Sequence, residues 1–217
     1  MYTPTLYEFV KRADEGNLIP VYREFVADTD TPVSAFMKLR QSGAEQHAFL
    51  LESVAGGAQI ARYSYLGIDP LEVVATKGRI ATIGENGSSR EVEIPAGQDP
   101  LDVVRGMLER YRFVPVEGCD RFYGGAVGYL GYDVVRFFED IPDDRPDDLQ
   151  LPDAHFMLTD TLVIFDHVTR KMRVVANAHV TGDPQAAYWE AIERIDRLVD
   201  ALRHPLQPRA PGAGLQG

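Results

Sequence analysis

Two polar residues at the end of an apolar run are the first candidates for chemistry. Residues 48–51 are apolar, and Glu52 and Ser53 follow them directly. A carboxylate and a hydroxyl at the end of a buried strand need a partner, which is either a ligand or another group of the protein. Within the protein, Glu52 can pair with Arg62 across a hairpin and Ser53 can cap a turn. On these residues alone the internal pairing is the simpler interpretation.

Histidines and carboxylates offer no second site. His155, His167 and His179 are twelve residues apart, but the last two are expected near opposite ends of a hairpin, so this spacing does not bring them together. No serine has a nucleophile-elbow context, and no pair of acidic residues has a spacing that would oppose them across a cleft. The sequence therefore predicts neither a catalytic residue nor a metal site.

A glycine-rich run, "YGGAVGYLGYD" at residues 123–133, superficially resembles a phosphate-binding loop. A dinucleotide fingerprint needs G-x-G-x-x-G between a strand and a long helix. This run has G-x-x-G-x-x-G among aromatic residues that favour strands. We therefore expect a strand whose glycines let a neighbouring backbone or aromatic ring approach closely.

Composition limits the possible partners. The 217 residues are 45% hydrophobic and 25% charged, which is ordinary for a globular protein, and the formal net charge is −11. The acidic balance argues against a nucleic-acid or anionic-membrane surface. The single cysteine, Cys119, excludes an intrachain disulfide, and neither a signal peptide nor a membrane-spanning segment is recognisable. We expect a cytoplasmic protein.

Four helices have clear start signals, namely Thr5 with Glu8 as a capping box, and the caps Thr31-Pro32, Asp99-Pro100 and Asp183-Pro184. Each cap precedes an apolar stripe at helical spacing, which we expect to face the core. The stripes are Leu6, Phe9, Val10 and Ala13; Val33, Phe36 and Met37; Leu101, Val104, Leu108 and Tyr111; and Tyr188, Ile192, Ile195, Val199 and Leu202.

Strands are predicted between these helices, and short turns between sequence neighbours favour antiparallel pairing. The predicted strands are two within 47–67, a hairpin within 71–83, and single strands at 91–94, 122–132, 156–165 and 172–180, the last two forming a hairpin. The predicted class is α+β, with mainly antiparallel sheets packed with several helices. The acidic segment 139–153 is expected to be an exposed loop.

Four segments together resemble the N-terminal half of anthranilate synthase component I. They are "LLES" at 50–53, "ARYSYLG" at 61–67, "GGAVGYLGYD" at 124–133 and "VIFDH" at 163–167, and the opening 16–39 is also similar. The resemblance covers nearly the whole chain. Each motif alone is weak, but four in the same order make a chance similarity improbable.

The resemblance implies that the synthesis of anthranilate is shared between two protein components, and that the catalytic residues of component I lie in a separate domain. In that family, component I converts chorismate to anthranilate with Mg²⁺ and ammonia, and a separate glutamine amidotransferase component supplies the ammonia. The chorismate pocket and the Mg²⁺ ligands would lie in a catalytic domain after Gly217. Residues 1–204 would form the N-terminal-like domain, and residues 205–217 a linker or disordered tail leading toward that domain. We expect this chain to hold no cofactor and to be inactive alone.

The resemblance also implies a ligand. In tryptophan-regulated members, the Leu-Leu-Glu-Ser segment lies beside bound L-tryptophan, a feedback inhibitor. A free amino acid needs an acceptor for its ammonium, donors for its carboxylate and an apolar wall for its ring. Glu52 would face the ammonium and Ser53 the polar end, and Leu50 or Leu51 would enclose the indole together with nearby aromatic residues. The implied partners are the catalytic domain, the amidotransferase component and L-tryptophan.

Three alternatives stay open. The relative para-aminobenzoate synthase component I, of the folate pathway, has a similar N-terminal half, although the Leu-Leu-Glu-Ser and Arg-Tyr-Ser segments favour anthranilate synthase and tryptophan biosynthesis. A stand-alone, non-catalytic sensor of aromatic amino acids would bind its ligand without a partner. A purely structural subunit would expose a large apolar patch.

Overall fold

The computed structural model describes residues 1–41, 47–52, 62–85, 87–118, 122–142 and 146–206. Ser53 and Cys119 lie outside these ranges. In chain order, the elements are β1 Tyr2–Thr3, α1 Leu6–Arg12, β2 Leu18–Val26, α2 Pro32–Gln41, β3 Ala48–Leu51, β4 Tyr63–Ile68, β5 Glu72–Lys77, β6 Ile80–Glu85, β7 Ser88–Glu93, α3 Pro100–Leu108, β8 Gly125–Leu130, the 3₁₀ helix η1 Tyr132–Phe137, β9 Ala154–Thr159, β10 Thr161–Asp166, β11 Lys171–His179 and α4 Pro184–Arg203. None of the described helices is long and apolar enough to cross a membrane.

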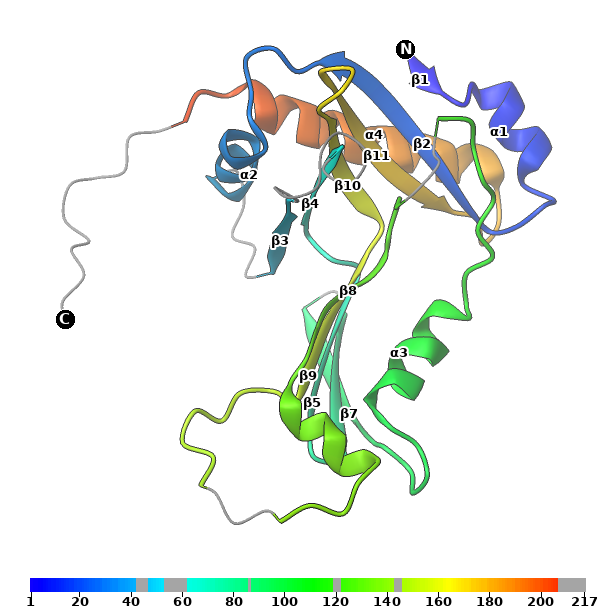
Figure 1. The fold of residues 1–217 in the computed structure, drawn as a ribbon. Coiled ribbons are helices and arrows are strands. Elements are labelled where there is room, and N and C mark those ends of the chain that lie inside the picture. The colour runs from blue at the N-terminus through cyan, green and yellow to red at the C-terminus, as the bar shows by residue number, and fades with distance from the viewer. Residues whose placement is uncertain (42–46, 53–61, 86, 119–121, 143–145, 207–217) are drawn as a thin grey trace.

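The larger sheet has six strands in the order β1-β2-β11-β10-β4-β3. Its neighbouring strands all pair antiparallel. Helices α1, α2 and α4 pack with this sheet around one core that includes Phe9, Leu39, Leu66, Val174 and Ile195 (Figure 1). Each of these five side chains is at most 1% exposed. The second sheet, at the other end of the molecule, has a small core of its own.

The smaller sheet has five strands in the order β7-β6-β5-β9-β8, again all antiparallel. Helix α3 and η1 lie beside it (Figure 1). Its small core contains Val74 and Ile83 from the sheet and Met107 from α3. A third apolar cluster joins the two sheets, since Met157 of β9 packs with Leu162 and Ile164 of β10. The predicted α+β class, with antiparallel sheets and several helices, is confirmed.

One predicted strand is two strands. The apolar run 156–165 forms the end of β9 in the smaller sheet and most of β10 in the larger sheet, and the chain changes sheets at Asp160. Asp160 is anchored there, because its carboxylate accepts hydrogen bonds from Arg194 and from the Thr161 hydroxyl. The expectation of one strand was wrong because no glycine or proline marks the break. The hairpin of β10 and β11 is confirmed.

The glycine-rich run forms strand β8, as expected, and its glycines meet the neighbouring backbone. A Cβ on Gly128 would overlap the carbonyl oxygen of His155 in β9, and one on Gly131 would lie 3.0 Å from the carbonyl oxygen of Asp153. Gly124 and Gly125 have φ values of +153° and +124°, which side chains disfavour. The run is therefore a close-packed edge strand.

The four predicted helices are present, with the expected capping box of Thr5 and Glu8 on α1. The stripe of α4 is buried as expected. The expected core face of α2 was wrong for Val33 and Met37, which are 48% and 49% exposed, whereas Phe36 packs against the core as expected. The fully buried residues of α2 are Pro32, Ala35 and Leu39. Apolar residues on both sides of this short helix left the choice of face to the tertiary contacts.

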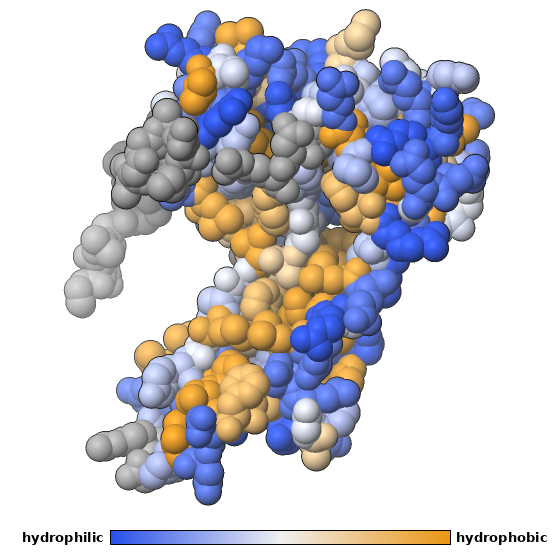
Figure 2. Space-filling model, turned by 45° about the vertical axis from the view of Figure 1, so that its right-hand side comes forward, coloured by the Kyte–Doolittle hydropathy of each residue, from blue (hydrophilic) through white to orange (hydrophobic). Residues whose placement is uncertain are grey.

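Apolar side chains are exposed beside the edge of the smaller sheet. Tyr129 and Leu130 of β8 are 45% and 44% exposed, Tyr132 of η1 is 84% exposed and Leu151 is 59% exposed. We call these four residues the β8 edge patch. The Tyr129 hydroxyl donates a hydrogen bond to the Pro152 carbonyl, which connects the strand to the acidic segment. Figure 2 shows hydrophobic residues gathered over the smaller sheet and its junction with the rest.

Candidate functional site

Three strands of the larger sheet end together near Glu52. The last residue of β3, Leu51, pairs with Tyr65 of β4. Strand β4 in turn pairs with β10, so that Ser64 lies opposite Phe165 and the end of β10 lies beside the start of β4. This register brings Ser64 next to Glu52, which directly follows β3, and next to His167, which lies 103 positions away in the sequence.

A polar cluster lies at these strand ends. The Ser64 Oγ lies 2.7 Å from His167 Nε2 and 3.5 Å from Glu52 Oε1. Ser64 is 1% exposed, whereas Glu52 is exposed. We call Glu52, Ser64 and His167 the strand-end cluster. Because a serine hydroxyl carries one proton, it can donate to only one of its two neighbours at a time.

An ion pair holds the loop that carries His167. The Arg62 guanidinium donates to both carboxylate oxygens of Asp166, with Nη2 2.7 Å from Oδ2 and Nε 3.1 Å from Oδ1. Backbone amides of Val168 and Thr169 also donate to Oδ1. Burial opposes ionisation of this carboxyl, but the bonds from Arg62 and the two amides outweigh it and hold the pKa of Asp166 at about 2. The His167 amide donates to the Arg62 carbonyl at 2.9 Å.

The predicted site residues occupy different positions around this cluster. Glu52 belongs to it, and its hydrogen-bond partner here is the Ser64 hydroxyl. Leu51 is 45% exposed at the end of β3. Ser53 lies outside the described residues, so its contacts stay a prediction. Arg62, considered above as an internal partner for Glu52, forms its bidentate pair with Asp166.

Sequence reasoning missed two members of the cluster, Ser64 and His167. Both lie within the segments "ARYSYLG" and "VIFDH", which carry the family resemblance, so a signal was available. What was missing was the strand register that brings the two segments together. Since the Ser64 hydroxyl is almost fully buried, the arrangement is suited to recognising a polar group at the exposed Glu52 rather than to nucleophilic attack on a large substrate.

The other histidines lie elsewhere. His155 of β9 is near His47 and Tyr129, with ring centroids 5.3 Å and 6.1 Å away. Burial, and then the positive charge of nearby His47, lower the pKa of His155. His179, at the end of β11, contacts Tyr111. Among the described residues, no three His, Cys, Asp or Glu side chains are grouped to hold a metal ion.

Comparison with known proteins identifies the family. Residues 46–215 match the family model described as chorismate binding enzyme. The chain is 41% identical to anthranilate synthase component 1 of Acetivibrio thermocellus over 199 residues, covering 91% of this chain and 39% of that protein. It is 39% identical to the Synechocystis protein of the same name over 215 residues, covering 97% of this chain and 41% of that protein.

A solved structure agrees with these similarities. The crystal structure of anthranilate synthase component I from Streptococcus pneumoniae TIGR4 matches with a TM-score of 0.51 and 26% identity, covering 84% of this chain and 37% of that chain. This chain thus spans about two-fifths of the length of the relatives that it matches. The predicted resemblance to component I of anthranilate synthase is confirmed. The chain belongs to the family of chorismate-binding enzymes.

Proposed function

We propose that this chain is the regulatory and scaffolding part of an anthranilate synthase component I that serves tryptophan biosynthesis. The complete protein would convert chorismate, with ammonia or glutamine, to anthranilate. Support comes from relatives of that name at 34–41% identity, each matched over about two-fifths of its length or less.

The regulatory half of the proposal depends on the strand-end cluster. The observation that carries it is that the exposed Glu52 carboxylate lies beside the buried Ser64 hydroxyl, which itself contacts His167. An amino-acid ammonium at Glu52 would form a charge-assisted hydrogen bond worth about 1.5–3 kcal/mol. Ser53 and Leu51 would contact the polar end and the ring of L-tryptophan. Tryptophan would inhibit the complete enzyme by binding an inactive arrangement more tightly than the active one.

The scaffolding half depends on the β8 edge patch. Four large apolar side chains are exposed along an edge strand and the segments next to it, and exposed apolar surface is typical of an interaction site. We assign it to contact with a chorismate-binding catalytic domain of the complete protein. Carboxylates of that domain would hold Mg²⁺. A glutamine amidotransferase component would supply the ammonia.

The test is a calorimetric titration of L-tryptophan into the 217-residue chain. We expect saturable binding that weakens at least tenfold in Glu52→Gln, because the neutral amide loses the charge-assisted bond. Ser53→Ala should weaken it as well. Glu93→Gln changes an exposed carboxylate of the other sheet and should leave binding unchanged. Tryptophan at about 100 times its Kd should raise the free energy of unfolding by ~2.7 kcal/mol.

A second ligand, which lacks the ammonium group, tests whether Glu52 recognises the ammonium of tryptophan rather than its ring. Indole-3-propionate keeps the ring and the carboxylate but lacks the ammonium, so it should bind more weakly and should not respond to Glu52→Gln. Equal binding of both ligands, or the absence of saturable tryptophan binding, would contradict the effector site in this chain. The purified chain should give no chorismate-dependent anthranilate fluorescence with Mg²⁺ and ammonia. A signal above background would refute the purely regulatory and scaffolding role.

A further inference from the structure

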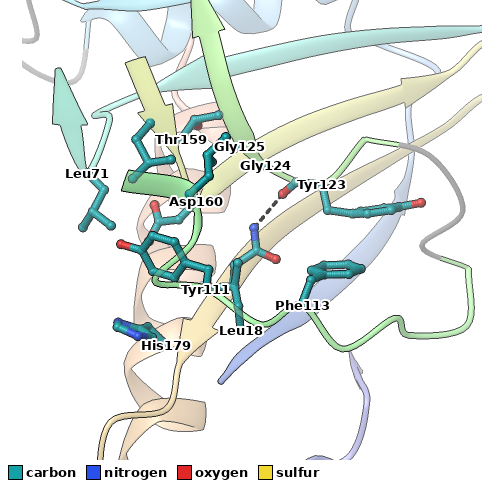
Figure 3. A pocket seen from close by; sticks show the side chains of 13 residues that line it. Leu18, Leu71, Tyr111, Phe113, Tyr123, Gly124, Gly125, Thr159, Asp160 and His179 are labelled. Carbon is teal, nitrogen blue, oxygen red and sulfur yellow. Dashed lines mark hydrogen bonds between the residues drawn. The ribbon is translucent and has the colours of Figure 1, made fainter. Parts of the chain in front are cut away.

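Two buried polar side chains, Asn177 and Ser64, differ in what they can reach. Asn177 lies beside the cavity where the two sheets meet, and its Nδ2 donates to the Tyr123 carbonyl oxygen at 2.6 Å (dashed line in Figure 3). Its Oδ1 is buried without a partner, so it is closed to any ligand in that cavity. Ser64 is also 1% exposed, but its hydroxyl contacts two exposed side chains, Glu52 and His167. The Ser64 hydroxyl therefore connects two groups that solvent and ligands can reach.

His167 is held in place although its side chain is exposed. It directly follows Asp166, the last residue of β10. Its backbone amide donates to the Arg62 carbonyl at 2.9 Å, and the Arg62 guanidinium is paired with Asp166. The imidazole Nε2 lies 2.7 Å from the Ser64 Oγ, which is an ordinary hydrogen-bond distance. The turn after β10 is thus anchored where the imidazole meets the buried hydroxyl.

The chemical types of the three groups decide the direction of both hydrogen bonds. An ionised carboxylate only accepts, so the bond between Ser64 and Glu52 uses the proton of the Ser64 hydroxyl. That hydroxyl has one proton, so its oxygen must accept from the Nε2–H of His167. The opposite arrangement, in which Ser64 donates to His167, leaves Glu52 without this bond. The two arrangements need different tautomers of the neutral imidazole.

The contact to Glu52 is the weaker of the two. The Ser64 Oγ lies 3.5 Å from Glu52 Oε1, whereas O–H···O bonds usually measure about 2.5–3.0 Å. Because Glu52 is exposed, this long contact alone holds its carboxylate loosely. When Nε2–H of His167 occupies the Ser64 oxygen, the hydroxyl proton is left to point at Glu52. An incoming ammonium then meets a carboxylate that is already oriented, which reduces the entropy lost on binding.

We propose that His167 is a positioning residue of the amino-acid site, which donates from Nε2 to Ser64 and so directs the Ser64 proton to Glu52. The inference rests on the proposed binding of an amino-acid ammonium at Glu52. His167 acts through Ser64 and does not itself need to touch the ligand. Fixing one flexible side chain before binding is worth roughly threefold to tenfold in affinity.

The test is a calorimetric titration of L-tryptophan into the 217-residue chain and its variants. His167→Phe removes the donor but keeps an aromatic ring, and it should weaken binding roughly threefold to tenfold. His167→Gln keeps a side-chain N–H and should restore most of the affinity. His204→Phe is the control, because His204 lies with Ile68 in a depression at the other end of β4 and should leave binding unchanged.

Ser64→Ala tests the connection itself and changes only one buried atom. It should weaken tryptophan binding as much as His167→Phe does, and the two changes together should weaken it no further, because both remove the same link. In a Glu52→Gln background, His167→Phe should have no additional effect. Indole-3-propionate, which lacks the ammonium, should bind equally to the unmodified chain and to His167→Phe, whereas general damage to the fold would weaken both ligands.

NMR of ¹⁵N-labelled protein at pH 8 reads the tautomer of His167 without any ligand. We expect the proton on Nε2, with a slowly exchanging N–H signal that Ser64→Ala removes. A proton on Nδ1, unchanged tryptophan binding in His167→Phe, or additive losses from Ser64→Ala and His167→Phe would overturn this inference and leave the proposed function standing. Absence of tryptophan binding to the unmodified chain would overturn both.

Discussion

Replacing Asp166 by asparagine should destabilise the protein in a pH-dependent way. Asp166 is 5% exposed, and its pKa is held at about 2, compared with an ordinary 3.8. At about 1.36 kcal/mol for each pH unit between these values, its charge contributes ~2.4 kcal/mol to the free energy of unfolding at neutral pH. Arg62, its partner, is 39% exposed, so solvent screening reduces the expected loss in Asp166→Asn to about 2 kcal/mol.

The sign of the pH dependence follows from the lowered pKa. The folded state holds the ionised carboxylate more strongly than the unfolded state does, so the stabilisation is fully present above pH 3.8. It is lost as the pH falls toward about 2. The difference between the original protein and Asp166→Asn should therefore fall to roughly half its neutral value at pH 3.

Urea unfolding followed by circular dichroism at pH 7, 5 and 3 measures this difference. Asp200→Asn is the matched control, because it removes the same charge from an exposed pair with Arg203 and should leave the unfolding midpoint unchanged. A loss in Asp166→Asn that is equal at pH 7 and pH 3 would refute the electrostatic argument. The carboxylate would then act only through its hydrogen bonds to the Val168 and Thr169 amides.

Three further predictions concern the sheets and helix α4. Gly128→Ala should lower the free energy of unfolding in urea by more than about 3 kcal/mol, because its methyl group would overlap the β9 backbone. As a control, the methyl group of Gly106→Ala in α3 meets no atom within 4 Å, so this change should be neutral or stabilising. The imidazole of His155 should titrate below pH 6.5 by NMR. The free energy of unfolding should fall as the pH drops below 6.5, because the unfolded state binds the proton more readily. A titration midpoint above 6.5 would contradict the burial argument. Asp183→Ala removes the cap bond to the Gln185 amide and should lower the free energy of unfolding by about 1 kcal/mol; no change would show that the cap is dispensable.

The strand-end cluster shows which residues of the candidate site can be predicted from the sequence and which cannot. Glu52 was recognisable because a carboxylate at the end of an apolar run needs a partner. Ser64 and His167 were visible only as members of similar segments, because their meeting depends on the registers of β3 with β4 and of β4 with β10. A shift of one residue in either register would turn Ser64 to the other face of the sheet.

The sequence by itself determined the features that depend on neighbouring residues. Thr5 with Glu8, Asp99 with Pro100 and Asp183 with Pro184 start helices because a cap bonds to amides only two or three positions away. The tertiary structure alone decided where β9 ends and β10 begins, which face of α2 is buried, and the unpaired Oδ1 of Asn177. These features depend on contacts between residues far apart in the chain, and such contacts leave no local pattern in the sequence.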